Sequence, residues 1–290
     1  MCKTLLLSSP LLSAIVAGAK VSGPSSLGRG GCRAMVSMVS GRRKRRLTGA
    51  EGGAVRTPVA LDRTAGGVPA IAQCHPERYD ELLAEKVASL EQLLEAATRR
   101  RQPAALPRVE VHESARSLFR MRADFSMWRE PDESVVYTMF NREDKRTPCE
   151  VREYPMGSAL INELMGPLRD ALGASRALRQ RLGDVRFLTT TTGEALVTIT
   201  YNRPIGEEWR DAAAPLAQEL GIKIVGRSRK VKIVVGGDET VQERLRVPNR
   251  GELRYTQTEG AFAQPNAGVC EQMLGWAYAE IAVDIAPRRG

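Results

Sequence analysis

Short segments in which apolar and polar residues alternate with a period close to two recur throughout the sequence after Pro107, and they constrain the fold more than any other feature. Alternation of this kind is typical of β-strands that bury one face. The segments are residues 109–111, 118–128, 135–140, 185–191, 195–201, 222–225, 231–235 and 253–256. Gly236, Gly237 and Asp238 follow one of them with residues typical of a tight turn. We therefore expect a β-sheet built from many short strands.

Segments with helical periodicity interrupt these strands. A helix is predicted over residues 76–101, because acidic residues open it and three arginines close it, which complements the helix dipole. Two more are predicted over residues 158–172 and 207–220, the second ended by Gly221, and a last helix begins near Asn266. This arrangement predicts an α+β fold, with a mainly antiparallel sheet and helices packed on one side.

The net charge of +9 and the isoelectric point of about 9.6 raise the question of a nucleic-acid partner. Most of the excess lies at the front of the chain. Residues 1–50 hold nine basic residues and no acidic one, which leaves as many basic as acidic residues in the remainder. A basic surface on the folded part would therefore have to be a local patch.

Residues 1–50 have the composition of an organelle-targeting segment, since they combine basic residues and eight serines with no acidic or aromatic residue. The apolar stretch 5–19 suits the hydrophobic region of a signal peptide, with a small-residue cleavage motif at its end. We expect import into a plastid or mitochondrion. The basic run 42–46 leaves a nuclear signal or a phosphate-binding arm, and so a nuclear or cytoplasmic protein, as alternatives. Residues 51–75, rich in Gly, Ala and Pro, are predicted to be a linker.

The cysteines and histidines do not suggest a metal centre. None of the five cysteines forms a C-x-x-C pair, and the chain has only two histidines, His75 and His112. This pattern argues against a zinc site or an iron–sulfur cluster, and we expect no metal. No stretch approaches the ~20 apolar residues needed to cross a membrane. We expect a monomer in a reducing compartment.

Six short motifs occur in an order that carries a family resemblance. Three are the most distinctive: F-R-M-R-A-D-F at residues 119–125, L-T-T at 188–190 and F-A-Q-P-N at 262–266. The others are A-E-K-V-A-S-L-E-Q-L-L around Glu85, I-N-E-L-M at Ile161 and V-G-R-S-R-K-V-K-I at Val225. Over about residues 76–280 the sequence resembles the bacterial TrmA family of tRNA (uracil-5-)-methyltransferases. Each motif alone is weak, and the shared order makes the resemblance specific.

The resemblance implies a substrate, a cofactor and a reaction. The family flips a T-loop uridine out of tRNA and methylates carbon five of uracil with S-adenosylmethionine. Carbon five is a poor nucleophile, so a cysteine thiolate first adds to carbon six and creates an enolate that takes the methyl group. A carboxylate base then removes the proton from carbon five, and the cysteine leaves. The implied partner is tRNA and the implied cofactor is S-adenosylmethionine.

The resemblance also divides the chain. It implies a tRNA-binding α+β domain over residues 76–250 and, over residues 251–290, the first strand and helix that lead into a Rossmann-like methyltransferase domain. The family's glycine-rich cofactor loop, its cysteine in an S-C-N-P context and its catalytic glutamate have no counterpart in this sequence. We therefore expect no catalytic residue in this chain and no activity from it alone. Cys270 lies where the family has no nucleophile, and we expect it to pack within a helix.

Five cations are predicted to bind RNA. Arg120 and Arg122 lie two residues apart on a predicted strand and so project from one face, which the resemblance places on the tRNA-facing sheet. Arg227 and Lys230 form a second basic group, and Arg203 is a third site. A solvated sheet surface would explain the same residues without RNA, so this prediction depends on the resemblance.

One residue is predicted to contact the cofactor. Gln264 matches the family glutamine with that role, although Gln264, Pro265 and Asn266 are also a good helix start in their own right. Two positions depart from the family. Gly183 replaces an aromatic residue that could stack on a base, and Asn202 replaces a histidine.

Three functions stay open from the sequence. The chain is a methyltransferase by descent whose missing part comes from a longer product or a separate chain, or a tRNA-binding or tRNA-remodelling module without catalysis, or an inert fragment. Its short form is either natural or the product of a truncated or misassembled gene. The gene sequence after residue 290 would distinguish these, because an in-frame glycine-rich loop and S-C-N-P motif would restore the enzyme.

Overall fold

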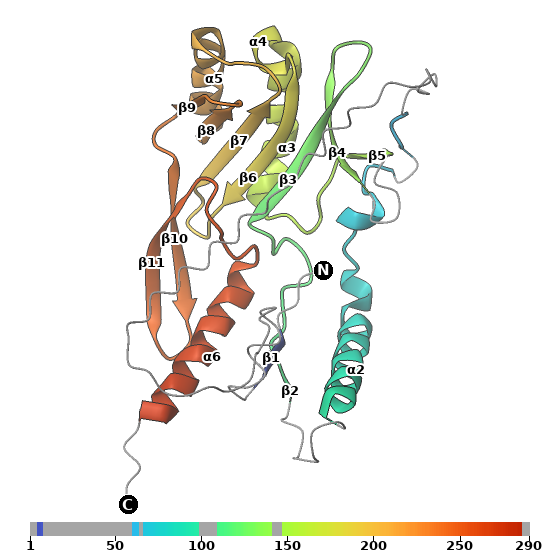
Figure 1. The fold of residues 1–290 in the computed structure, drawn as a ribbon, viewed down its shortest axis with the longest axis vertical. Helices are drawn as coiled ribbons and strands as arrows, with labels where there is room; N and C mark the ends of the chain where they lie inside the picture. The colour runs from blue at the N-terminus through green and yellow to red at the C-terminus, as the bar shows by residue number, and fades with distance from the viewer. Residues whose placement is uncertain (1–4, 8–59, 64–65, 99–108, 141–146, 286–290) are drawn as a thin grey trace, which may run out of the picture. The chain divides into compact units, whose positions relative to one another are not determined.

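A seven-stranded sheet organises the part of the chain that the computed structural model describes, residues 5–7, 60–63, 66–98, 109–140 and 147–285 (Figure 1). Its strands follow the order β5-β4-β3-β6-β7-β8-β9. Their bounds are β3 Arg122–Arg129, β4 Val135–Phe140, β5 Pro148–Val151, β6 Leu182–Thr189, β7 Ala195–Tyr201, β8 Lys223–Arg227 and β9 Lys232–Val235. Neighbouring strands pair antiparallel except β7 and β8, which are parallel.

The parallel pair follows from the helix between its strands, since a crossover returns the chain in the same direction. This helix, α5, spans Glu207–Leu220, and Gly221 ends it in the left-handed conformation (φ 63°), as the sequence predicts. Two helices precede β6: α3 (Ala159–Ala174) and α4 (Arg176–Arg179). The Ser158 hydroxyl accepts a hydrogen bond from a first-turn amide of α3 and so caps it.

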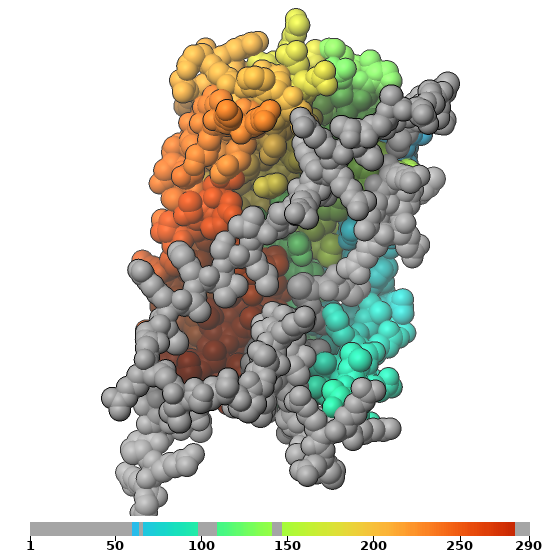
Figure 2. Space-filling view, in the orientation of Figure 1, coloured from blue at the N-terminus to red at the C-terminus, as the bar shows by residue number. Residues whose placement is uncertain are grey.

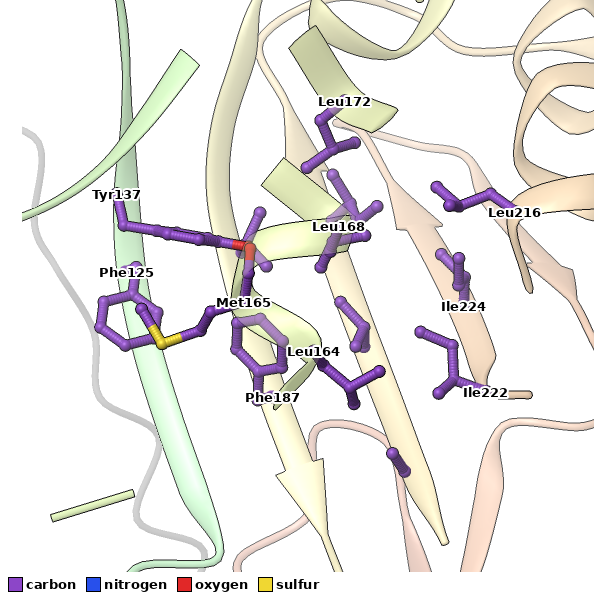
Figure 3. Close-up of a cluster of buried hydrophobic side chains, with 14 of the residues drawn as sticks. Phe125, Tyr137, Leu164, Met165, Leu168, Leu172, Phe187, Leu216, Ile222 and Ile224 are labelled. Carbon is purple, nitrogen blue, oxygen red and sulfur yellow. The ribbon is translucent and has the colours of Figure 1, made fainter. Parts of the chain in front are cut away.

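Helices α3 and α5 cover one face of the sheet and form the main core with it (Figure 3). Phe125 of β3 and Phe187 of β6 lie in one buried cluster with Leu168 of α3 and Leu216 of α5. The two phenylalanine rings meet edge to face, with their centroids 6.0 Å apart. Because side chains alternate along a strand, the other face, which we call the open face, carries the remaining side chains of the same strands.

Three elements follow the sheet: β10 (Thr240–Val247), β11 (Gly251–Thr258) and α6 (Ala267–Ile285). The two strands form an antiparallel hairpin, and β10 packs against α6. Leu245 and Val247 of β10 share a small core with Ala267 of α6, and Met121 packs against it. The boundary predicted between residues 250 and 251 falls in the turn of this hairpin.

The front of the described chain is helical. The sequence predicts one helix over residues 76–101; the structure has a single 3-10 turn, η2 (Pro76–Arg78), followed by α2 (Tyr79–Thr98). A second such turn, η1 (Ala70–Ala72), precedes them, and β1 (Leu5–Leu7) pairs antiparallel with β2 (Val109–Val111). The Tyr79 hydroxyl accepts a hydrogen bond from the backbone amide of Ser114 at 2.8 Å, which ties α2 to the segment that leads into the sheet.

A buried carboxylate links the hairpin to the sheet. Glu243 is 3% exposed, and its Oε1 accepts hydrogen bonds from the amide and the hydroxyl of Thr191 at 2.9 and 2.6 Å. Its Oε2 accepts one from Gln257 of β11 at 3.1 Å. Thr191 lies in the turn between β6 and β7, so one side chain joins both strands of the hairpin to the sheet.

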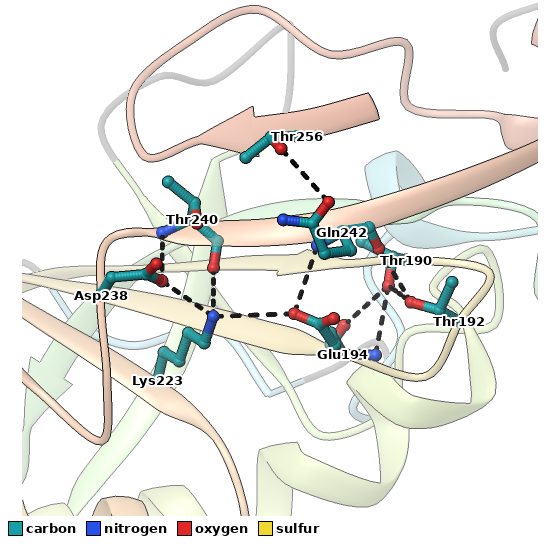
Figure 4. A network of polar contacts seen from close by, with 8 residues as sticks. All are labelled: Thr190, Thr192, Glu194, Lys223, Asp238, Thr240, Gln242 and Thr256. Atoms are coloured by element: carbon teal, nitrogen blue, oxygen red, sulfur yellow. Dashed lines mark hydrogen bonds and ion pairs between the residues drawn. The ribbon is translucent and has the colours of Figure 1, made fainter. Parts of the chain in front are cut away.

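Lys223 makes a second link (Figure 4). Its ammonium group donates to the Asp238 carboxylate at 2.8 Å and to the Thr240 carbonyl at 2.6 Å, and lies 3.7 Å from the Glu194 carboxylate. Glu194 in turn accepts a hydrogen bond from the amide of Gln242 at 3.2 Å. The start of β8, the turn before β10 and the turn between β6 and β7 are thereby held together.

The α+β class, with a mainly antiparallel sheet and packed helices, is confirmed. The local expectations differ mainly at three strands. A strand is predicted over residues 118–128, but β3 begins at Arg122, because Leu118 has a φ of 53° and Arg120 forms isolated bridges with Gly157 and Asn266 instead. Strands β5 and β10 are additions that the alternation did not predict.

The cysteines of the described ranges lie in sheltered positions. Cys149 is buried, and Cys74 and Cys270 are half-buried. Cys270 packs against the core between β10 and α6, as the sequence predicts. Burial raises the pKa of its thiol, which disfavours the nucleophilic thiolate. In this part of the chain no three His, Cys, Asp or Glu residues are grouped to hold a metal ion, and no helix is long and apolar enough to span a bilayer.

Candidate nucleic-acid interface

The open face of the sheet carries arginines from three strands. The registers of β3, β6, β7 and β8 place Arg122, Arg186 and Arg227 on this same side, because paired residues and residues two apart share a face. Arg186 lies 3.8 Å from the Asp124 carboxylate on the neighbouring strand. Two of the predicted RNA-binding residues, Arg122 and Arg227, therefore belong to one surface.

Arg120 and Arg122 play different structural roles. The Arg122 guanidinium donates to the carbonyl of Ala261 at 2.9 Å, so it contacts the loop that follows β11. Arg120 precedes β3, and its Nε donates to the carbonyl of Arg122 at 2.9 Å. Its backbone bonds to Met156 and Ser158 at 2.8 Å each. Both arginine side chains are only half-buried, so their remaining N–H groups stay available to a phosphate.

Arg227 is held in an ion pair with Glu259. The carboxylate is 2% exposed, and Nε of Arg227 donates to its two oxygens at 3.0 and 2.9 Å. The Thr198 hydroxyl donates to the same carboxylate at 3.1 Å. Burial alone raises the pKa of Glu259, but the hydrogen bonds and charge of Arg227 outweigh it, so the pKa lies below its ordinary value. The charge of Arg227 is therefore largely neutralised within the protein.

The other two predicted cations contrast with each other. Arg203 donates to the carbonyls of Gln180, at 2.9 Å, and of Ala177, and its guanidinium lies over the Tyr201 ring at 5.6 Å from the centroid. It thus satisfies carbonyls at the end of α4. Lys230 is exposed in the turn between β8 and β9, with no ion pair or hydrogen bond to any described residue. Lys230 is the more accessible of the two for a ligand.

Hydrogen bonds at Pro265 and Asn266 fix the end of the Gln-Pro-Asn motif in the segment 262–266. The carbonyl of Pro265 accepts a hydrogen bond from the amide of Met121 at 2.7 Å. Asn266 caps α6 by accepting from the amide of Val269 at 3.0 Å, and it donates to the Ser114 hydroxyl at 2.6 Å. Gln264 is half-buried, and its amide has no hydrogen bond to a described residue. The side-chain amide of Gln264 therefore stands beside a hydrogen-bonded segment and can still bond to a ligand.

The two positions that depart from the family lie side by side. Gly183 sits at a register irregularity in β6, and a β-carbon built there would stand 3.1 Å from Nδ2 of Asn202. A large side chain at residue 183 would thus have to displace Asn202. The absent aromatic residue and the replaced histidine are one local difference.

A small cavity lies beneath the loop after β11. Arg122, Arg186 and Glu259 line it, together with Thr198 and Ala261. Its volume of about 20 Å³ is enough for about one water molecule. It does not accommodate a nucleobase or a nucleoside cofactor, so any RNA contact here is made on the surface.

Sequence reasoning missed a group of arginines on the hairpin. Arg244 and Arg246 of β10 and Arg254 of β11 are exposed on one face of it. The alternation in residues 240–247 could have revealed them, because it predicts a strand with both of its arginines on one side. The pairing of Arg227 with Glu259, 32 residues away, has no sequence signal, since it depends on how the hairpin returns to the sheet.

Comparisons with known proteins agree on one family. The model of the family described as tRNA (Uracil-5-)-methyltransferase matches residues 78–285. A tRNA/tmRNA (uracil-C(5))-methyltransferase of Ectopseudomonas mendocina is 49% identical over 203 residues, which cover 70% of this chain and 53% of the relative. Its namesake in Pseudomonas paraeruginosa is 48% identical over 207 residues, 71% of this chain and 54% of the relative. The chain spans about half the length of the curated relatives it matches.

Proposed function

The chain belongs to the tRNA (uracil-5-)-methyltransferase family, and we propose from this premise that it forms the tRNA-binding part of an enzyme that methylates carbon five of a T-loop uridine. The observation that carries the proposal is the match over residues 78–285. This range includes the whole sheet, the hairpin and the segment that presents Gln264. The curated relatives are named for tRNA and for carbon five of uracil.

The open face is the proposed tRNA surface. Arg122 projects there beside Arg186, and Lys230 lies at its edge with no ion pair or hydrogen bond to a residue that the structure describes. Phosphate contacts from such residues position a nucleic acid and carry no sequence information. Arg227 serves the same surface indirectly, because its ion pair with Glu259 holds the segment after β11 in place. Arg203 contacts the end of α4, which packs with α3 and α5 on the other side of the sheet.

Gln264 is the proposed contact to S-adenosylmethionine. Its carboxamide can donate and accept hydrogen bonds, and within the described ranges neither group is engaged, so the residue fits this role. When bound, the cofactor supplies the methyl group as an electrophile. A single carboxamide contact does not offset the loss of translational freedom on binding, so we infer that Gln264 contributes to a site whose other contacts come from further residues.

We further propose that methyl transfer requires parts that this sequence does not include. The matched relatives are about twice as long as the region they share with this chain. Residues 251–290 would then begin the Rossmann-like methyltransferase domain, which supplies the cofactor loop, the nucleophilic cysteine and the base. A tRNA-binding module without catalysis is the second candidate, and it is favoured by the complete sheet core of the described part.

Two measurements on the purified chain test these proposals. It should bind an unmodified tRNA transcript in a fluorescence anisotropy titration, and it should show no saturable heat with S-adenosylmethionine in calorimetry. Failure to bind tRNA would overturn the substrate assignment. Saturable cofactor binding near micromolar concentration, which corresponds to ~8 kcal/mol, would show that a cofactor pocket is complete within these residues.

The proposed subcellular localisation rests on residues 1–50, which lie outside the described residues apart from residues 5–7. We infer that they direct import into a plastid or mitochondrion and that residues 51–75 link them to the folded part. A fusion of residues 1–50 to a fluorescent protein tests this. A diffuse cytosolic or purely nuclear signal would contradict it.

A further inference from the structure

The β10–β11 hairpin, which lies in the orange part of Figure 2, carries three exposed arginines on one face: Arg244, Arg246 and Arg254. The register places Arg244 directly opposite Arg254, and Arg246 directly opposite Glu252. The side chains of Arg244 and Arg254 are 44% and 76% exposed. Like charges directly opposite one another destabilise a strand pair, so folding alone does not explain this arrangement.

One carboxylate contacts two of the three arginines on this face. Glu252 accepts a hydrogen bond from Arg254 at 2.5 Å and lies 3.7 Å from Arg244. Its hydrogen bond with Arg254 holds the pKa of Glu252 below its ordinary value, and the charges of Arg244 and Arg246 add to this. The Arg246 side chain has no acidic partner among the described residues. The face therefore retains a net positive charge.

The open face of the sheet differs in this respect. There Arg186 lies near Asp124, Arg227 pairs with Glu259, and Lys232 at the sheet edge pairs with Glu239. Each of these cations thus has a carboxylate of its own. The hairpin face instead gathers three arginines around one carboxylate, Glu252, although none of its arginines carries a motif of the family resemblance.

We propose that the exposed face of the hairpin, formed by Arg244, Arg246 and Arg254, binds the phosphate backbone of the RNA substrate. The proposal rests on the proposed function for the identity of the polyanion. Arginine presents a planar fork of N–H groups that suits phosphate oxygens. Arg244 and Arg246 are two residues apart on a strand, about 6.8 Å along the chain, so they can meet separate phosphates.

The other residues of this face favour RNA over a lipid surface. Gln242 and Thr256 are paired across the strands beyond the arginines, and the Thr256 hydroxyl donates to Gln242 at 3.2 Å. Membrane-surface elements need apolar side chains to insert among the lipids, and this face offers polar groups instead. The hairpin is followed within a few residues by Gln264, so the proposed RNA surface and the proposed cofactor contact are neighbours along the chain.

Fluorescence anisotropy with an unmodified tRNA transcript, using the full chain between about 50 and 200 mM salt, tests the proposal. The double variant Arg244→Gln/Arg254→Gln should lower the slope of log affinity against log salt by about two, since each phosphate contact releases about one counterion. Arg246→Gln alone should lower it by about one. Glu252→Gln should tighten binding, because it removes the competing carboxylate. Circular dichroism confirms that each variant is folded.

The matched control is Arg78→Gln/Arg210→Gln, which removes the same charge from two exposed arginines that also pair with glutamates, Glu81 and Glu207. The control should bind tRNA like the unaltered chain. An equal loss of salt slope in both double variants would show that only net charge matters. An unchanged slope in the hairpin variants would show that the hairpin does not bind RNA. Either result contradicts the hairpin inference and leaves the proposed function intact. If the unaltered chain binds no tRNA, both the hairpin inference and the proposed function are contradicted. Binding to phosphatidylserine vesicles that needs these arginines, with tRNA binding unaffected, would assign the face to a membrane surface and overturn the proposal.

Discussion

The indole of Trp209 lies against the backbone of Gly226, so closely that a β-carbon on residue 226 would stand 2.5 Å from Cη2 of the ring. Trp209 is fully buried at the start of α5, and Gly226 belongs to the buried strand β8. The absence of a side chain at residue 226 thus allows α5 to pack on the sheet.

Gly226→Ala should therefore destabilise the protein by about 1–3 kcal/mol through overpacking, measured as the free energy of unfolding in urea. The control is Gly173→Ala in α3, where the new β-carbon would meet Val135 at an ordinary 3.7 Å. That variant should be as stable as the parent or more stable, by up to about 1 kcal/mol, because alanine favours a helix. Equal effects at both positions would contradict the assigned contact.

Arg227→Ala should cost about 3 kcal/mol near neutral pH, because it leaves the Glu259 carboxylate buried without its main donor. The estimate is the low end of the usual range, since Arg227 is 41% exposed and water screens the pair. Urea unfolding measures this cost. Arg210→Ala, which breaks an exposed pair on α5, should cost less than about 0.5 kcal/mol.

The same variant should show a characteristic pH dependence. In the parent the pKa of Glu259 is lowered, so its contribution is complete above the ordinary value of 4.5 and is lost as the pH falls through the folded-state pKa. Without Arg227, burial raises that pKa, and protonation then favours the folded state. The stability difference between parent and variant should shrink from about pH 7 to about pH 4. A difference independent of pH would show that Glu259 is not the group involved.

Glu243→Ala should loosen the hairpin from the sheet. The change leaves the amide of Thr191 and the side chain of Gln257 without their acceptor, at a cost of about 1–3 kcal/mol. Hydrogen exchange of the amides in residues 240–258 should accelerate more than exchange in β6 and β7. Gln242→Ala, on the exposed side of the same strand, should change neither stability nor exchange appreciably.

Substitutions at Arg122 can distinguish the effect of its charge on RNA binding from the effect of its side-chain shape. Together, Arg120→Ala and Arg122→Ala should lower the salt slope of tRNA binding by up to about two. Arg122→Lys keeps the charge but loses the planar fork that reaches Ala261. If Arg122 binds phosphate, the lysine variant should retain most of the slope in anisotropy titrations. Equal losses for lysine and alanine would assign Arg122 to holding the loop instead.

The sequence predicted those parts of the fold that depend on local periodicity. Alternation identified β4 and β7 with their bounds, and Gly221 marked the end of α5. It missed β10 because three of its eight residues are charged and its buried face includes Glu243, a residue that seldom faces a core. The start of β3 was misplaced because contacts of Arg120 with distant segments, rather than local preference, set it.

The candidate site was harder to predict, because contacts between residues far apart in the sequence decide which of its cations are accessible. Spacing along a strand placed Arg122 on the surface facing away from the helices, yet nothing local distinguishes the neutralised Arg227 from the exposed Lys230. The distinction depends on Glu259, which reaches Arg227 only through the turn of the hairpin. Arg244 and Arg246 were overlooked because β10 was not recognised, and nothing local distinguished Arg254 within the strand predicted over residues 253–256.

The hydrogen bonds that fix the Gln-Pro-Asn segment also bear on the order of folding. Asn266 bonds to Ser114, 152 residues earlier, and Pro265 bonds to Met121 at the entrance to β3. Contacts between such distant positions form only after a large loss of chain entropy, so they follow the formation of the nearer strand pairs. During synthesis, Ser114 and Met121 leave the ribosome long before their partners Asn266 and Pro265. Gln264 therefore reaches its position only in a molecule whose sheet is already assembled, and a chain arrested at an earlier stage cannot display it.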